Sequence, residues 1–299
     1  KPPVVGGVER VIADQAAAMN MPCYIVGGFV RDLLLGKPVN DLDIIVEGDA
    51  IKLGNELVRK FGGKLTPHQK FHTAIWHLPS SFTLHPSSLD LITARTETYK
   101  HPGALPTVTP STIDDDLRRR DFTINAMAVR LDGEHFGKLI DPLNGQTDLE
   151  NKIVRVLHSN SFIDDPTRIF RAVRYEQRYN FSLESSSLNS INSASLSVIS
   201  ALSGERIRHE FDLIFEEENS LQMILRASSL DIFKWIHPEL PVFNSEYAEF
   251  LDAPSILGIA ASRTTMGYML WLLDLSEDAI MSIERRLDFS SDLTHAVWA

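Results

Sequence analysis

YIVGGFVRD, at residues 24–32, decides the fold of the first half of the chain. Tyr24, Ile25 and Val26 form a short apolar run that is typical of a buried strand, and two glycines end it. Apolar residues then recur at helical spacing from Val30 to Leu35. A strand, a tight turn and a helix in immediate succession predict a domain that mixes both kinds of secondary structure.

The segments that follow continue this alternation. We expect a strand at Leu42–Val46, a helix at Ile51–Phe61, and strands at Thr73–Leu78 and Ser88–Ala94. Arg95–Pro110 contains three prolines and one glycine, which favours a long loop. The first half is therefore predicted to be an α+β domain with a mixed sheet.

After residue 111 the pattern becomes mainly helical. Thr112 can cap a helix with Asp115 three residues later, and Thr123–Val129 contains good helix formers. A short β-like insert is expected within Lys138–Leu157, followed by helices beyond Pro166. The serine-rich stretch at 182–200 is predicted to be helical rather than a linker, because its apolar residues recur at near-helical intervals.

Composition narrows the class of protein. With 299 residues, 43% of them hydrophobic, the chain is long enough for two or three packed units. No apolar run approaches the roughly 20 residues of a membrane-spanning helix, so no membrane partner is expected. A single cysteine, Cys23, and the absence of a signal-peptide core favour the cytoplasm. Nothing in the sequence predicts an oligomeric state.

A formal charge of −11 ordinarily argues against a nucleic-acid partner, but the positive charges are clustered. Arginines gather at 118–120 and again at 168, 171, 174 and 178. Solvated helix faces would account for both clusters. Alternatively, Arg174 and Arg178 predict a positively charged surface along one helix, where RNA would bind with a strong salt dependence.

The first group that could carry chemistry is Asp41-Leu42-Asp43 at the start of an expected strand. Residues two apart on a strand point to the same face, so the two carboxylates would converge while Leu42 enters the core. Carboxylates, waters and substrate phosphates are the ligands that Mg²⁺ prefers. Taken alone this pattern is weak, because aspartates at a turn before a strand are common.

The second group is the glycine turn itself. Gly27 and Gly28 would let a phosphate approach the backbone at a helix start, and Arg31 lies one turn further on. A tight strand-to-helix turn without a ligand would use the same glycines.

The third and fourth groups are RRRDFTINAMAV at 118–129 and DDPTRIFRAVRY at 164–175. In the latter, Asp165, Arg168, Arg171 and Arg174 share one helix face, as an exposed ion-paired helix would also show.

These four motifs, together with SGERIRHE at 203–210, resemble the class II tRNA nucleotidyltransferase and bacterial poly(A) polymerase family in order and approximate spacing. The resemblance spans residues 22 to about 215. It implies a head with the nucleotidyltransferase fold shared with DNA polymerase beta, then an all-helical neck and a partial body. We place these domains at 1–137, 138–217 and 218–299.

The resemblance also implies an activity and a set of site residues. The activity is magnesium-dependent addition of CCA, or of C or A alone, to the 3′ end of tRNA from CTP and ATP without a nucleic-acid template. Metal ligands would be Asp41 and Asp43, with Asp90 as a third catalytic carboxylate. The nucleotide-binding residues would be Gly28, Arg31, Arg120, Asp121, Asp165, Arg168, Arg171 and Arg174.

Three details complete this expectation. The family often has Glu before the selecting Asp, whereas this chain has Asp164 before Asp165. Glu205–Ile207 would be a structural brace or simply a helix start capped by Ser203. The loop at 95–110 would be a flexible active-site loop.

The sequence alone leaves other activities as alternatives. Poly(A) synthesis belongs to the same family, and a non-catalytic RNA-binding relic would keep the same scaffold. A nucleotidyltransferase acting on a small molecule would need the head but not the arginine-lined helix. The intact Asp41, Asp43, Arg31 and Asp165 argue against a non-catalytic relic, which would be expected to lose the metal carboxylates.

Overall fold

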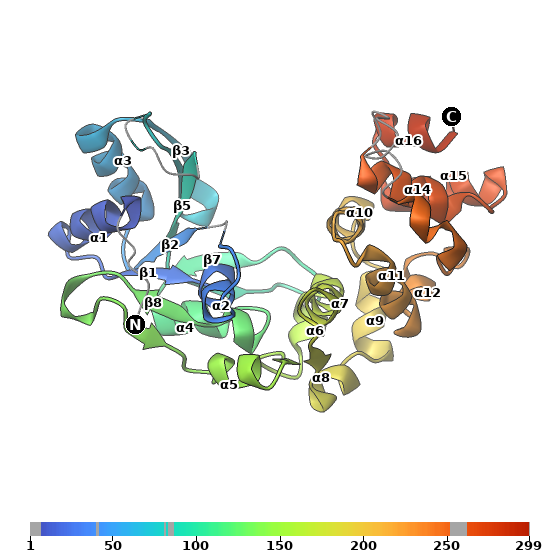
Figure 1. The fold of residues 1–299 in the computed structure, drawn as a ribbon, viewed down its shortest axis with the longest axis horizontal. Coiled ribbons are helices and arrows are strands. Elements are labelled where there is room, and N and C mark those ends of the chain that lie inside the picture. Colours follow the sequence, from blue (N-terminus) through green and yellow to red (C-terminus); the bar gives the residue numbers. More distant parts are fainter. Residues whose placement is uncertain (1–6, 40–41, 81, 83–86, 252–261, 299) are drawn as a thin grey trace. The chain divides into compact units, whose positions relative to one another are not determined.

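The computed structural model describes residues 7–39, 42–80, 82, 87–251 and 262–298 (Figure 1). The chain forms two compact units, of which the first contains Lys1–Lys100 and Leu105–Leu157, and the second contains His101–Ala104 and His158–Ala299. The division into head, neck and body stays a prediction. Across the part of the chain that is described, no helix has the length and apolar character that crossing a bilayer requires.

A seven-stranded sheet forms the centre of the first unit, with the strand order β3-β4-β5-β2-β1-β8-β9. Every neighbouring pair is antiparallel except β2 and β5, which are parallel. This confirms the mixed sheet. In chain order the strands are β1 (Cys23–Val26), β2 (Asp43–Val46), β3 (Lys64–His68), β4 (Thr73–His77), β5 (Ser88–Thr93), β8 (Ala128–Arg130) and β9 (Leu139–Ile140).

The sheet continues past residue 137, where we expect the head to end. Leu139 and Ile140 of β9 pair with Val129 and Ala128 of β8. The first unit accordingly extends to Leu157.

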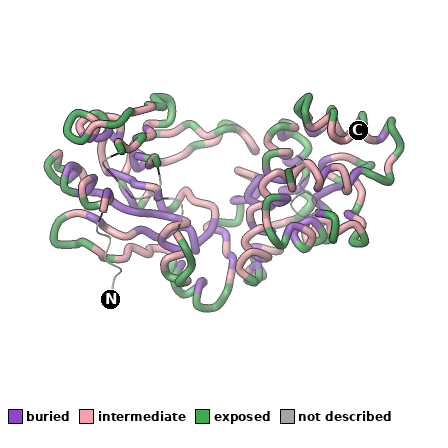
Figure 2. The backbone as a smooth tube through the Cα atoms, turned by 45° about the horizontal axis from the view of Figure 1, so that its top comes forward, coloured by how far each residue is buried: buried purple, intermediate pink, exposed green. Residues whose placement is uncertain are grey.

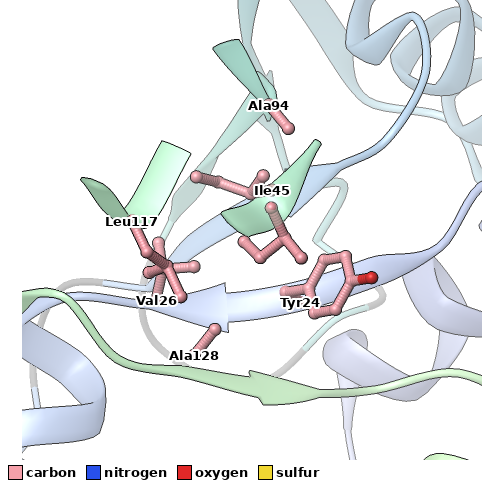
Figure 3. Packing of buried hydrophobic residues seen from close by; sticks show 7 residues of the cluster. Tyr24, Val26, Ile45, Ala94, Leu117 and Ala128 are labelled. Atoms are coloured by element: carbon pink, nitrogen blue, oxygen red, sulfur yellow. The ribbon is translucent and has the colours of Figure 1, made fainter. Parts of the chain in front are cut away.

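Helices pack on this sheet because its strands bury side chains on both faces. Tyr24 and Val26 of β1 point to the same face, where they meet Ile45 of β2 and Leu117 of α4 (Figure 3). Ile25 alternates to the opposite face and is also buried. The helical segments of this unit are α1 (Val8–Ala18), α2 (Gly28–Leu34), α3 (Ala50–Phe61), η1 (Gln69–Phe71), α4 (Ile113–Arg118), η2 (Thr123–Asn125), η3 (Gly133–His135) and α5 (Gly145–Glu150).

Two sequence expectations for this unit are wrong. The segment 95–110 is not a plain loop, because β6 (Arg95–Thr98) and β7 (Thr107–Pro110) pair as an antiparallel hairpin. The segment 123–129 is not a continuous helix, since one 3₁₀ turn leads directly into β8. The helix start at Thr112 is confirmed, and its side chain accepts a hydrogen bond from the backbone N–H of Asp115.

The second unit is almost entirely helical. Its serine-rich stretch forms α8 and α9, with a capping box at Asn192 and Ser195, so the prediction of helix there is confirmed. The helices are α6 (Ser161–Asp164), α7 (Thr167–Tyr179), α8 (Ser185–Asn189), α9 (Ser193–Ile199), α10 (Gly204–Phe215), α11 (Ser220–Ser229), α12 (Ile232–Ile236), η4 (Ser245–Phe250), α14 (Arg263–Leu272), α15 (Glu277–Leu287) and α16 (Ser291–Trp298). Two further strands of two residues each are β10 (Ile153–Val154), which belongs to the first unit, and β11 (Ser182–Leu183).

Aromatic side chains fill the centre of this helical unit. The ring of Phe211 on α10 lies 5.5 Å from that of Phe170 on α7 and 4.8 Å from that of Trp271 on α14. Their edge-to-face geometry is a favourable arrangement for aromatic pairs. The buried stretches of Figure 2 run through the interior of each unit, while exposed residues lie mainly in turns and on outer faces. Helix α7, which carries the arginine row, is therefore anchored by its apolar face.

Candidate active site

The glycine turn between β1 and α2 brings backbone and guanidinium groups together. Gly27 has a φ of +68°, and a Cβ atom there would lie 2.6 Å from Nη1 of Arg120. A Cβ atom on Gly28 would lie 3.3 Å from Nη2 of Arg31. Only a residue without a side chain allows both this backbone conformation and this approach at Gly27.

Arg31 is almost fully buried and braces the loop around it. Its Nε and Nη2 donate to the two carboxylate oxygens of Asp32, both at 2.9 Å, and its Nη1 donates to Oδ1 of Asn125 at 2.6 Å. A hydrogen bond between charged groups is stronger than one between neutral groups. In this structure Arg31 thus organises its surroundings, and a role in triphosphate binding stays a prediction.

Asn125 connects two residues that the sequence singled out separately. Besides accepting from Arg31, it donates through Nδ2 to Oδ1 of Asp121 at 2.9 Å. Asp121 also accepts from the backbone N–H of Phe122 at 2.8 Å. Sequence reasoning missed Asn125, although it lies inside the RRRDFTINAMAV motif four residues after Asp121.

A second missed residue, Asp116, binds two of the three arginines of that motif. It is fully buried and accepts from Nε and Nη2 of Arg119 and from Nη2 of Arg120, at 2.8–3.0 Å. The backbone N–H of Arg95 donates to it as well, at 3.2 Å. The available signal was the spacing, since helix residues three and four apart share a face.

We predict that Asp116→Asn lowers the stability of the first unit substantially. Asn would turn one acceptor oxygen into a donor and remove the counter-charge of Arg120, whereas Arg119 keeps its ion pair with Glu97, and we expect a cost of about 3 kcal/mol or more. Asp114→Asn is the matched control, because Asp114 forms an exposed ion pair with Arg118 on the same helix. Denaturant unfolding measures both variants, and equal stabilities of the two would contradict the proposed role of Asp116.

Asp43 and Asp90 meet at the centre of the sheet. Asp43 is the first residue of β2 and lies directly opposite Asp90 of β5 in the parallel pairing. The next pair, Ile44 and Leu91, is buried on the other face. Asp43 is half-buried and Asp90 is exposed.

Asp41, the other expected metal ligand, lies outside the described residues. Among the residues that are described, no three side chains of His, Cys, Asp or Glu are grouped closely enough to hold a metal ion. The structure thus brings two of the three predicted carboxylates together.

In the second unit, Asp165 is surrounded by donors. Its Oδ1 accepts from the backbone N–H and the hydroxyl of Thr167 at 3.2 and 2.7 Å. Its Oδ2 accepts from Nη2 of Arg171 at 3.1 Å and lies 3.9 Å from Nε of Arg168. The expected association of Asp165 with these two arginines is therefore present.

Arg168 is more buried than its partner. Its side chain is 5% exposed, compared with 17% for Asp165, and its Nη1 donates to the hydroxyl of Ser161 at 2.6 Å. In this pair the carboxylate of Asp165 is therefore the more exposed group, and the guanidinium of Arg168 is held beside it by Ser161.

The remaining arginines of α7, from which we expected a positive surface, form ion pairs with glutamates. Arg174 donates to Glu210 of α10 at 3.4 Å and lies 3.6 Å from Glu217, and Arg178 donates to Glu217. Burial raises the pKa of the Glu210 carboxyl, although the charges of Arg171 and Arg174 act in the opposite direction. Glutamates far along the chain thus compensate these charges, and the salt dependence of RNA binding stays a prediction.

A third residue that the sequence left without a role is Arg206 of α10. Ser203 caps this helix by accepting from the backbone N–H of Arg206, as expected. The side chain of Arg206, however, donates from Nη2 to Oδ1 of Asp165 at 3.1 Å and from Nη1 to the carbonyl oxygen of Gly103 at 2.6 Å. Arg206 lies in the segment interpreted as a brace, so it belongs with the Asp165 group.

Comparison with protein families matches two parts of the chain. Residues 23–155 match the model described as poly A polymerase head domain. Residues 180–243 match the model described as probable RNA and SrmB-binding site of polymerase A.

Relatives and solved structures extend this similarity. The chain is 44% identical over 223 residues to an A-adding tRNA nucleotidyltransferase of Geobacter sulfurreducens, covering 74% of this chain and 25% of that protein. A second A-adding tRNA nucleotidyltransferase, from Halalkalibacterium halodurans, is 40% identical over 228 residues, which cover 75% of this chain and 52% of that protein. The chain thus spans a quarter to about half of the length of these relatives.

One solved structure, a CCA-adding enzyme in an apo form, matches with a TM-score of 0.85 and 35% identity. The match covers 97% of this chain and 69% of that structure.

Proposed function

This chain belongs to the family of CCA-adding tRNA nucleotidyltransferases and poly(A) polymerases, and on that premise we propose that it adds all or part of CCA to the 3′ end of tRNA. CTP and ATP would be the nucleotide substrates. The 3′-hydroxyl would attack the α-phosphate, and pyrophosphate would leave. A cytoplasmic location is part of the same proposal and rests on the tRNA substrate.

The pairing of Asp43 with Asp90 is the observation that carries this proposal. Two carboxylates in register on neighbouring strands supply the hard oxygen ligands that Mg²⁺ prefers, and the chain places Asp41 two residues before Asp43. A bound Mg²⁺ would stabilise charge on the transferred phosphate and make the attacking hydroxyl more nucleophilic. The donor set therefore fits the metal that the family implies.

The other residues would position the substrates. Arg31 and Arg120, on either side of the Gly27–Gly28 turn, are the cations of this unit that we assign to the triphosphate. Asp165 and Arg168 are assigned to the nucleobase. Such a site works by positioning and by electrostatics and needs no covalent intermediate with the protein.

Addition of the terminal A alone is the version of this activity that the two curated relatives favour, since both are named A-adding enzymes. Addition of CC, of the complete CCA, and poly(A) synthesis are the alternatives within the family. They differ in the primer end that is accepted, so the primer is what an experiment should vary.

The test uses three tRNA primers, which end at the discriminator base, at C and at CC. Each is incubated with the protein, magnesium and one labelled nucleotide at a time, and products are resolved by length. Addition of one A to the CC end alone identifies an A-adding enzyme, and long A tails on any primer identify poly(A) synthesis.

Two further conditions make the test decisive. EDTA should abolish the reaction, and excess Mg²⁺ should restore it. No addition to any primer from any nucleotide would contradict the proposed function.

A further inference from the structure

Arg206 links two groups that are distant in sequence. One is Asp165, which precedes α7, and the other is Gly103, at the tip of the β6–β7 hairpin. The tip residues His101–Ala104 belong to the second unit, as Asp165 and Arg206 do. One guanidinium therefore holds both a carboxylate oxygen and a backbone carbonyl oxygen.

The tip itself is held closely beside Asp165. The backbone N–H of Gly103 donates to the carbonyl oxygen of Asp164 at 3.2 Å, and Gly103 has a φ of +70°. A Cβ atom at this position would lie 3.1 Å from Cγ1 of Val198. The conformation and the close packing both favour glycine at the tip.

The hydrogen bonds of Asp165 divide unequally between its two oxygens. Oδ1 accepts from three donors, which are the N–H and hydroxyl of Thr167 and Nη2 of Arg206. Oδ2 accepts one hydrogen bond, from Arg171. A carboxylate offers about four lone-pair sites in all, so Oδ1 is saturated and Oδ2 keeps capacity for a further donor.

We propose that Arg206 is a positioning residue for nucleotide selection, and that it extends this role to the hairpin tip through Gly103. By completing the hydrogen bonding of Oδ1, Arg206 directs Oδ2 toward the exocyclic amine of cytosine or adenine. The tip shares the same guanidinium, because Gly103 accepts from Nη1 of Arg206 and Asp165 accepts from Nη2. This inference rests on the proposed function.

The test compares Arg206→Ala with wild-type protein in two measurements. The first is the ratio of kcat/KM for ATP or CTP to that for GTP or UTP on a tRNA primer. Loss of one charge-assisted hydrogen bond to Asp165 should lower this ratio about 10-fold. The second is hydrogen exchange at the amide of Gly103, which should become about 10-fold faster when the tip loses its partner.

Arg208→Ala is the matched control. Arg208 lies on the same helix, donates to the carbonyl oxygen of Leu287 at 3.1 Å and lies 4.0 Å from Asp212. Its loss removes an arginine from α10 without touching Asp165, so base discrimination should stay as in wild type. Arg206→Lys should restore part of the discrimination, because a single ammonium keeps the charge but not the two-pronged geometry.

The possible outcomes separate this inference from the proposed function. Wild-type discrimination in an active Arg206→Ala protein, or unchanged exchange at Gly103, would overturn the role of Arg206 and leave the proposed function standing. Wild-type protein that adds no nucleotide to any primer would refute the proposed function and this inference together.

Discussion

Replacing Asp43 by Ala should abolish nucleotide addition and leave the fold intact. The neighbours of Asp43, Leu42 and Ile44, are buried and provide apolar contacts, whereas Asp43 itself is half-buried and lies in register with the exposed Asp90. Removing a metal ligand takes away several kcal/mol of transition-state stabilisation, which corresponds to a rate loss of roughly 10³-fold or more. Asp41→Ala is expected to give the same result.

Primer extension under saturating magnesium measures this effect, and thermal unfolding measures the fold. Asp114→Ala removes an exposed carboxylate of the same unit and should keep full activity. Asp43→Asn is a second variant, which preserves the shape of the side chain and removes its charge. If Asp43→Ala turns over at a near-normal rate with magnesium, the proposed metal site is wrong.

Selection of the nucleobase should be lost when Asp165 or Arg168 is replaced. Cytosine and adenine both present an exocyclic amine beside a ring acceptor, N3 or N1, on the Watson–Crick edge. A carboxylate accepts from the amine, and a guanidinium donates to the ring nitrogen. Uracil and guanine present the reverse pattern, a carbonyl oxygen and a ring N–H, so both contacts fail.

The expected size of this effect is large. A site built for specific hydrogen bonds leaves buried polar groups unpaired with the wrong base, and discrimination of about 10⁴-fold is then attainable. We expect Asp165→Ala and Arg168→Ala to lose most of it while they retain metal-dependent chemistry.

Incorporation of ATP, CTP, GTP and UTP on one tRNA primer provides the comparison. Because Arg168 is buried and bonded to Ser161, its replacement also needs a measurement of stability. Asp165→Asn avoids a cavity, and Arg178→Ala removes an arginine of the same helix that pairs with Glu217. If the Asp165 and Arg168 variants keep the wild-type preference, selection lies in other residues.

Much of the first unit could be predicted from the sequence because several of its strands are short segments rich in apolar residues and are bounded by glycine, proline, serine or a helix. The strands near 24–26, 42–46, 73–77 and 88–93 all follow this rule. The hairpin at 95–110 does not, since its strands are mostly polar and half-exposed and the second ends in Pro110. Pairing between its two strands, rather than local preference, determines that structure.

The candidate site was predictable where sequence spacing determines geometry. Arg168 and Arg171 lie three residues apart on α7, and the structure brings Asp165, which precedes this helix rather than continuing its face, to both of them. Asp116, Asn125 and Arg206 were missed because their function depends on tertiary partners. The pairing of Arg174 and Arg178 with glutamates of α10 and the residues after it was likewise invisible to local patterns.

The parallel pairing of β2 and β5 also has a consequence for the folding pathway. Parallel neighbours cannot be joined by a tight turn, and α3, β3 and β4 intervene along the chain between Asp43 and Asp90. Closing this long loop costs entropy before any contact compensates for it, so such pairings form slowly. The hairpin of β3 and β4 can form early, whereas the two carboxylates acquire their register only as the centre of the sheet closes.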